Sequence, residues 1–382
     1  MIGQVALSLL LLIGAGLFIR SLVHLETMDV GYSRAHLVLL QIDPAASGYS
    51  RSQQLPLMRS LLERLRSVPG VLDVTTSENG LFSGHDSSSD SFRIEGFTPT
   101  RKEDASCNFD QIGPRYFQVL GVPILAGRDF DQRDNAGAPN VVIINDTMAR
   151  FYFGKGNPLG KQILNGNDRY TIVGVVKDMK QRDLKSKTER RVYAPLLQTT
   201  DRISPIHFEI RTRGDAALSI SGTRRDMQAF NRNLKVLSIA PVRMLMEDSI
   251  SEERLIAQLC GFFGVLALLL AATGLYGVMA YATSRRANEI GLRMALGAER
   301  GNVIWMVLRE TLVVVAAGIV IGSGFALVAT RLVASMLTGL SANDPATIGV
   351  AISIMLIMGT LAGVIPAIRA SRIDPMTALR QE

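Results

Sequence analysis

A basic segment between two long apolar stretches carries the side chains best spaced to bind a partner. Arg286, Arg293 and Arg300 recur every seven residues within 281–301, and Glu289 stands four residues before Arg293. This spacing predicts a helix whose charges form one stripe. Such a segment suits a short amphipathic helix, lying at a bilayer surface or docked in a partner's groove. An ordinary basic loop beside a membrane helix is the simpler interpretation.

Other polar patterns lack residues that catalysis or ligand binding would need. The stretch 154–162, GKGNPLGKQ, resembles a phosphate-binding loop, but Lys155 stands where the first glycine belongs and Gln162 where Ser or Thr must hold magnesium. The polar loop 83–90 matches no calcium loop, and the four histidines show no ligand spacing. The sequence also lacks the G-x-S-x-G and H-E-x-x-H motifs. We therefore expect a protein that is not an enzyme and carries no metal site or cofactor.

Composition favours a membrane protein. Of 382 residues, 47% are hydrophobic and 20% are charged, and the net charge is +7. No zinc-finger, helix-turn-helix or aromatic-interleaved basic pattern accompanies that charge, so basic residues flanking membrane helices explain it better than nucleic acid does. Cys107 lies in a polar region and Cys260 in an apolar one, so no disulfide is expected.

Four apolar segments approach or exceed the roughly 20 residues that cross a bilayer as a helix. They are Ile2–Ile19, Leu255–Thr283, Thr311–Thr330 and Ala346–Ile368. The loop after the second segment and the tail are rich in arginine, whereas 332–345 has no basic residue, which places both basic segments in the cytoplasm. Parity then puts the N-terminus inside and the long stretch from Ser21 to Arg254 outside. Arg20, just beyond the first segment, disagrees with this orientation.

The long stretch has a mixed character that predicts an α+β domain. Strands are expected at 36–42, 71–76, 141–144, 170–176, 192–196, 207–212 and 235–237, and helices at 50–67, 114–120, 145–153 and 215–231. The predicted fold class is a membrane α-helical protein with four transmembrane helices in a 1+3 arrangement and a large extracytoplasmic α+β domain between helices 1 and 2. The expected domains are residues 1–23, 24–246 and 247–382.

Local signals mark where the later helices begin. Ser249 and Glu252 have the spacing of a capping box, so we expect the second membrane helix to begin at Ser249. A helix over 249–283 would be about 50 Å long against a hydrocarbon core of about 30 Å, so Ser249, Glu252, Glu253 and Arg254 would form a protruding stalk. Asp344-Pro345 predicts the start of the fourth membrane helix, and Asp374-Pro375 that of a short tail helix.

Paired glycines at one-turn spacing mark the last two membrane helices. They are Gly318 with Gly322 and Gly359 with Gly363. Small residues at this spacing let helix backbones approach closely, so a role in helix packing is expected.

Several motifs resemble those of MacB/FtsX-type ABC transporter permeases. They are EIGLRMALGA at 289–298, SANDP at 341–345, PAIRASRIDPMTAL at 366–379, YFQVLGVPILAGRDF at 116–130, NPLGKQ at 157–162 and YTIVGVVKD at 170–178. The resemblance covers nearly the whole chain, and the chain is similar in particular to the C-terminal half of duplicated permeases of this class.

The resemblance implies a MacB-type periplasmic core domain, an inner-membrane location and a role in export or efflux without catalysis. It implies a dimer with a second permease copy or half, a cytoplasmic ABC ATPase that binds the ATP, and surrounding membrane lipids, with a periplasmic adaptor and outer-membrane duct as further candidates. A helix over 289–298, within the basic segment, would be the coupling helix that docks on the ATPase. Its candidate residues are Arg286, Glu289, Ile290, Gly291, Leu292, Arg293, Met294, Ala295, Leu296, Gly297 and Arg300.

Two other functions fit the same layout. An FtsX-like regulator of an envelope hydrolase would share this architecture. A membrane sensor would need a separate output partner, because the cytoplasmic segments are too short for a kinase or cyclase domain. The sequence leaves these alternatives open, together with the substrate and the direction of transport.

Overall fold

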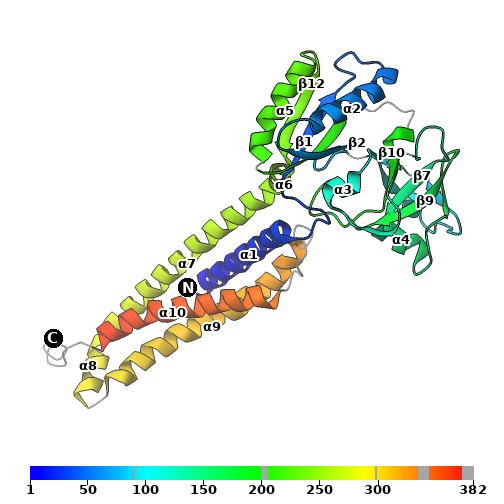
Figure 1. The fold of residues 1–382 in the computed structure, drawn as a ribbon. Helices are drawn as coiled ribbons and strands as arrows, with labels where there is room; N and C mark the ends of the chain where they lie inside the picture. Colours follow the sequence, from blue (N-terminus) through cyan, green and yellow to red (C-terminus); the bar gives the residue numbers. More distant parts are fainter. Residues whose placement is uncertain are drawn as a thin grey trace. The chain divides into compact units, whose positions relative to one another are not determined.

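The computed structural model describes residues 1–382 except 86, 90–91, 132, 199–204, 215, 297–298, 334–343 and 372–382. It divides into two compact units (Figure 1). The first, Met1–Met28 with Ser251–Glu382, is called here the helical unit, and the second, Asp29–Ile250, the α/β unit. The predicted tail helix at Asp374 and the first three residues of the SANDP motif lie outside the described residues.

The helical unit contains four helices long and apolar enough to cross a membrane. Its described elements are α1 (Ile2–Thr27), α7 (Ser251–Arg285), the short α8 (Ala287–Ala295), α9 (Arg300–Val333) and α10 (Pro345–Ala370). As predicted, α10 begins at Asp344-Pro345, where the carboxylate of Asp344 accepts a hydrogen bond from the Thr347 amide at 3.0 Å.

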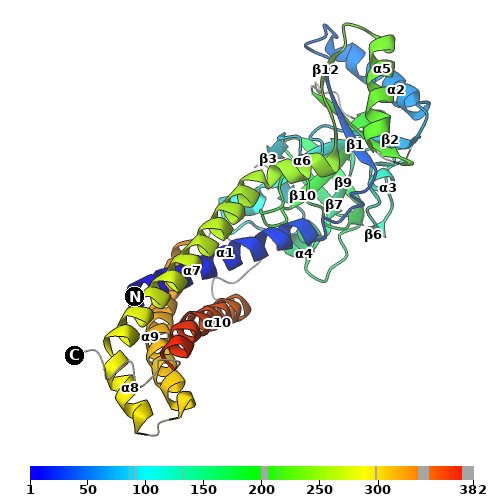
Figure 2. The ribbon, with the colours of Figure 1, turned by 90° about the vertical axis from the view of Figure 1, so that its left-hand side faces the viewer.

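Helix α1 packs against α7, α9 and α10 and is central to the helical unit (Figure 2). Its buried residues Val5, Leu9, Ile13 and Leu17 follow a four-residue spacing and form one face of the apolar core. Its polar side chains are also satisfied. The amide of Gln4 donates to the Leu270 carbonyl at 2.7 Å, and the hydroxyl of Ser8 donates to the Ala267 carbonyl at 2.9 Å. Unsatisfied polar groups are costly in hydrocarbon, so these bonds help to fix α1 against α7.

The α/β unit is built on one long, mostly antiparallel sheet. Its strand order is β12-β1-β11-β2-β5-β10-β7-β9-β8-β4, and among the described residues only the β5–β10 and β7–β9 pairs are parallel. The strands are β1 (Leu37–Asp43), β2 (Val71–Ser77), β3 (Ser87–Ser89), β4 (Phe92–Ile94), β5 (Cys107–Ile112), β6 (Ile124–Gly127), β7 (Val141–Asn145), β8 (Gln162–Asn165), β9 (Asp168–Val176), β10 (Arg191–Pro195), β11 (Ile206–Thr212) and β12 (Lys235–Pro241). The helices are α2 (Arg51–Arg66), α3 (Tyr116–Leu120), α4 (Asp146–Phe153), α5 (Ala216–Phe230) and α6 (Val242–Ser249), with short 3-10 helices at Lys102–Ala105 and Leu196–Gln198.

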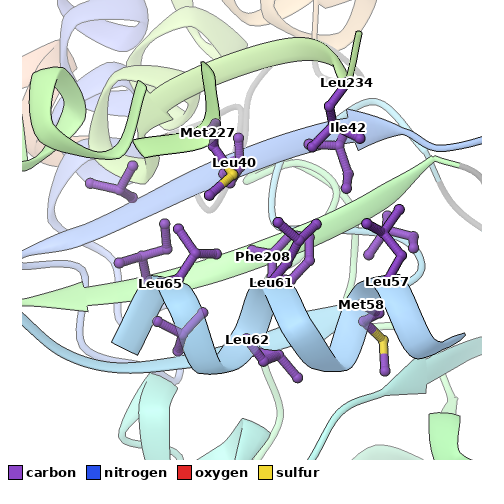
Figure 3. Packing of buried hydrophobic residues seen from close by; sticks show 14 of the residues in the cluster. Leu40, Ile42, Leu57, Met58, Leu61, Leu62, Leu65, Phe208, Met227 and Leu234 are labelled. Atoms are coloured by element: carbon purple, nitrogen blue, oxygen red, sulfur yellow. The ribbon is translucent and has the colours of Figure 1, made fainter. Parts of the chain in front are cut away.

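Two hydrophobic cores lie in different parts of this sheet. In the first, Leu57, Leu61 and Leu65 of α2 pack with Phe208 of β11 (Figure 3). Their spacing of four residues places them on one face of the helix, which the sheet buries. The second core gathers residues of β4, β7, β8, β9 and β10 around Val142 and Ile172.

The predicted strands and helices of the α/β unit are confirmed, with small shifts at their ends. Strand β5 was not predicted, because Asp110 and Gln111 interrupt its apolar pattern although both are buried. Helix α6 was not predicted either. The unit runs from Asp29 to Ile250, against the predicted domain 24–246, and α1 continues to Thr27.

Candidate partner-docking site

Helix α8 follows α7 after a single non-helical residue. Arg286 has φ −98° and ψ 12°, which ends α7 at Arg285 and allows a new helix to start at Ala287. The predicted coupling helix over 289–298 is therefore shorter and starts earlier, since α8 ends at Ala295. Gly297 lies outside the described residues.

An apolar contact fixes α8 against the start of α9. Ile290 is 1% exposed and forms a small core with Val303, and Met294 and Met306 pack on it. Gly291 beside it is also buried. These contacts hold one face of α8 on the helical unit.

Two ion pairs lie at the same place. The guanidinium of Arg286 is 2.6 Å from the carboxylate of Glu310 on α9, and Arg293 is 2.6 Å from Glu289 on α8. Arg293 also donates to the sulfur of Met306 at 3.3 Å. The Glu310 carboxylate raises the pKa of Arg286, which keeps this residue cationic. Surface pairs of this kind contribute at most about 1 kcal/mol each, so they orient α8 more than they stabilise it.

The other face of α8 is open in the part of the chain that the structure describes. Leu292 is 51% exposed and Leu296 is 81% exposed. Exposed leucines on a short helix with basic neighbours form the kind of surface that a partner's groove accepts.

The predicted stripe of three arginines on one helix is wrong. Arg286 precedes α8, Arg293 lies on α8, and Arg300 is the first residue of α9. The seven-residue spacing gave a false stripe because the chain has to reverse direction between two membrane helices. Glu310, which pairs with Arg286, was not among the predicted site residues. Its position directly before the apolar run that starts at Thr311 could have indicated it.

At the opposite end of α7, the predicted capping box is also wrong. Ser249 is the last residue of α6, and its hydroxyl donates to the Met246 carbonyl at 2.7 Å instead of capping a following helix. Helix α7 starts at Ser251 and includes Glu252, Glu253 and Arg254 in its first turn. Arg254 is 3.0 Å from Glu26 of α1, so this part of the predicted stalk is tied to the first membrane helix.

Arg20, which disagreed with the predicted orientation, forms an ion pair with Asp344 at the start of α10. Its charge is therefore compensated within the helical unit. The bonds from Thr347 and the nearby Arg20 lower the pKa of Asp344, so this carboxylate is ionised at neutral pH.

The four paired glycines lie where membrane helices approach each other. A Cβ atom at Gly322 would lie 2.8 Å from the Ala6 carbonyl oxygen of α1, and one at Gly318 would lie 2.5 Å from Val5. A Cβ atom at Gly359 or at Gly363 would lie 2.7 Å from Val315 or Thr311 of α9. Because glycine has no side chain, α1 can pack closely against α9, and α9 against α10.

A buried polar cluster in the α/β unit was not recognised in the sequence. His207 and Glu209 of β11 and Asp110 of β5 are each 0% exposed, where the strands of the two cores meet. The hydroxyl of Ser77 donates to Glu209, and the Nδ1 atom of His207 donates to the Glu78 carbonyl at 2.7 Å. Burial raises the pKa of Glu209 well above its usual value and lowers the pKa of His207 to about 4, so burial favours the neutral form of both groups. Among the described residues, no group of three or more His, Cys, Asp or Glu could hold a metal ion.

Comparison with known families matches both parts of the chain. The MacB-like periplasmic core domain matches residues 1–237, and the FtsX-like permease C-terminal domain matches residues 261–375. The chain belongs to the MacB/FtsX-type ABC transporter permeases. The predicted family and the 1+3 fold class of this permease are thus confirmed, and it is a multi-pass membrane protein.

Curated relatives of the permease are distant in sequence. Macrolide export ATP-binding/permease protein MacB 1/2 of Paracoccus denitrificans is 27% identical over 73% of this chain and 42% of the relative. The chain spans less than half the length of that relative. The uncharacterized ABC transporter permease YknZ of Bacillus subtilis is 25% identical over 74% of this chain and 72% of the relative.

Solved structures are also similar. The crystal structure of the periplasmic region of MacB from Actinobacillus actinomycetemcomitans has 17% sequence identity and a TM-score of 0.39, and the match covers 56% of this chain and 92% of that one.

Proposed function

We propose that this permease couples ATP hydrolysis by a separate cytoplasmic ABC ATPase to movement of its α/β unit, as part of an export system in the inner membrane. The observation that supports this most strongly is the two-faced character of α8. One face is held on α9 through Ile290, and the other exposes Leu292 and Leu296.

A force applied to α8 has a continuous route into the membrane helices. Ile290 packs on Val303, and Arg286 joins the end of α7 to Glu310 of α9. Because packed interiors deform little, displacement of α8 moves both helices. Helix α7 has 35 residues, about 52 Å at 1.5 Å per residue, and so extends beyond a hydrocarbon core of about 30 Å. A displacement at the α8 end therefore reaches the end that joins the α/β unit.

The relatives support a system in which the permease and the ATPase are separate chains. Proteins named as ATP-binding/permease are matched over 42% to 45% of their length, whereas the relative named as permease alone is matched over 72%. In this proposal ATP binds to the partner ATPase, and a second permease copy or half completes a dimer. A periplasmic adaptor and an outer-membrane duct are candidate further partners, because several relatives are named as export proteins.

The test is copurification of the full chain with a co-expressed cytoplasmic ABC ATPase of the same organism. Leu292→Asp with Leu296→Asp puts two charges on the open face of α8, and we expect at least a tenfold loss of bound ATPase, which corresponds to about 1.4 kcal/mol. Gly291 is not suitable for substitution, because it is buried and a larger residue there would unseat α8.

The control is Leu72→Asp, which makes the same change at a leucine of the α/β unit that is 53% exposed. It should retain the ATPase. Unchanged copurification of the double α8 variant would contradict the docking role.

A further inference from the structure

One face of α9 beside the docking site, apart from Met306 and Glu310 that contact α8 and Arg286, has no function in the proposed coupling. Residues Asn302, Trp305, Met306, Arg309, Glu310 and Val313, together with Val314, line a hollow of about 580 Å³. Asn302, Trp305, Arg309 and Val313 are three or four residues apart, so they follow one another along a single face. Trp305 is 60% exposed and Val313 is 62% exposed.

This face carries an uncompensated positive charge. Its acidic residue, Glu310, is paired with Arg286 at 2.6 Å. Arg309 has no ion pair or hydrogen bond within the described part of the chain. The hollow therefore favours an anionic group.

The order of residues along α9 matches the layers of a bilayer surface. Arg309 lies two residues before the uncharged run Thr311–Thr330, and Trp305 lies one turn further from it. Helical side chains lean toward the N-terminus, which directs the Arg309 guanidinium away from the hydrocarbon. Val313, one turn into the run, and Val320, which is 73% exposed, continue the face as aliphatic surface. A ligand that is complementary to this whole face of α9 therefore needs an anionic headgroup and an apolar chain.

We propose that this face of α9 binds an anionic phospholipid, with its phosphate between the Arg309 guanidinium and the Trp305 ring, and its glycerol region and an acyl chain along Val313. A soluble ATPase cannot follow the face into the hydrocarbon. A second copy joined symmetrically through this face would bring the two Arg309 side chains together, which like-charge repulsion opposes. The lipid site does not depend on ATPase docking, so either proposal can fail alone.

The chain contains a single tryptophan, Trp305, which is a built-in probe of this site. The full chain is reconstituted in vesicles of phosphatidylcholine mixed with phosphatidylglycerol, with one of the two lipids brominated near the glycerol end of its acyl chain. Bromine quenches tryptophan fluorescence on contact, so the quenching gives the relative affinity of the two lipids at Trp305.

We expect a preference for phosphatidylglycerol of about fivefold, the effect of one cation at an anionic surface. Arg309→Gln should abolish this preference. Arg285→Gln, which removes a cation at the end of α7 that does not line the hollow, should keep it. Arg309→Gln should also leave ATPase copurification unchanged.

Three results would overturn the lipid site. Equal quenching by both lipids would show that Arg309 selects no headgroup. Loss of the preference on addition of millimolar inorganic phosphate would assign Arg309 to soluble anions. Absence of quenching by either lipid would mean that protein, such as a second copy, covers the face.

Discussion

The two ends of the helical unit use their charges in opposite ways. At the end that joins the α/β unit, ion pairs link different helices, with Arg20 of α1 on Asp344 before α10 and Arg254 of α7 on Glu26 of α1. At the α8 end, ion pairs hold α8 in place while Leu296 and Trp305 stay exposed. We call the first end the closed end because its ion pairs join helices of the unit to one another, whereas the second end is the one at which we propose that a partner docks.

The α/β unit shows a third arrangement, in which ionisable groups lie in the interior. His207 and Glu209 are fully buried two residues apart on β11, and burial favours the neutral form of each. Each group keeps one hydrogen bond, Glu209 with Ser77 and His207 with the Glu78 carbonyl, whereas the Nε2 atom of His207 and the Oε2 atom of Glu209 have no partner among the described residues. The middle of the helical unit relies instead on close approach at glycine. The three arrangements should respond differently to substitution.

The largest expected effect is a pH dependence carried by β11. His207 keeps a low pKa when folded, so it destabilises the fold as pH falls from about 6.5 toward about 4. Glu209 keeps a raised pKa, so its contribution to stability is full below about 4.5 and is lost as pH rises. Between about pH 4.5 and 6.5, His207 makes the free energy of unfolding rise with pH and Glu209 makes it fall. Each slope is at most about 1.4 kcal/mol per pH unit.

Single variants should separate these slopes. Relative to the wild type, Glu209→Gln should lose stability as pH falls through this window, and His207→Gln should gain it. Both pH dependences are measured by unfolding the full chain in urea at about pH 4.5 to 6.5, with protease cleavage of the α/β unit as the signal for unfolding. Parallel pH profiles for the wild type and both variants would show that these groups do not titrate as their burial implies.

Packing in the middle of the helical unit should give the next largest effect. Gly322→Ala places a methyl group against the backbone of Ala6, so α1 and α9 must separate, at a cost of about 1 to 3 kcal/mol. Gly324→Ala on the same helix is the control, because a Cβ atom there has nothing within 4 Å. Thermal unfolding in detergent compares the two variants, and equal melting temperatures would mean that α1 and α9 are not in contact as described.

The smallest effect should come from the closed end. Asp344→Ala removes both the cap of α10 and the ion pair with Arg20, with an expected loss of about 1 to 2 kcal/mol. Asp344→Asn keeps a capping oxygen and removes only the charge, so it should lose less than about 1 kcal/mol. The same thermal measurement applies. A loss from Asp344→Asn as large as that from Asp344→Ala would mean that the charge, rather than the cap, holds this end.

Sequence periodicity predicted the membrane helices and most of the sheet because long apolar runs and alternating strands carry strong local signals. The start of α10 was predicted for the same reason, since Asp344 and Pro345 act within one turn. The break at Arg286 and the end of α6 at Ser249 were not, because each depends on contacts with residues distant in the sequence. Ile290 packs on Val303, and Arg286 pairs with Glu310. A pattern of charges cannot show where such a chain turns.

The buried cluster on β11 was missed for a related reason. His207 and Glu209 alternate with apolar residues as they would on a strand with one face in water. Only the packing of α3 against β2 and β11 reveals that this second face is also covered.

Photo-crosslinking from the two ends of the helical unit tests the central claim most directly. A photoreactive residue replaces Leu296, on the open face of α8, or Val23, which is 50% exposed near the closed end. If α8 is the docking element, the ATPase is crosslinked from position 296 and not from position 23. No crosslink from position 296, or equal capture from both positions, would contradict the account.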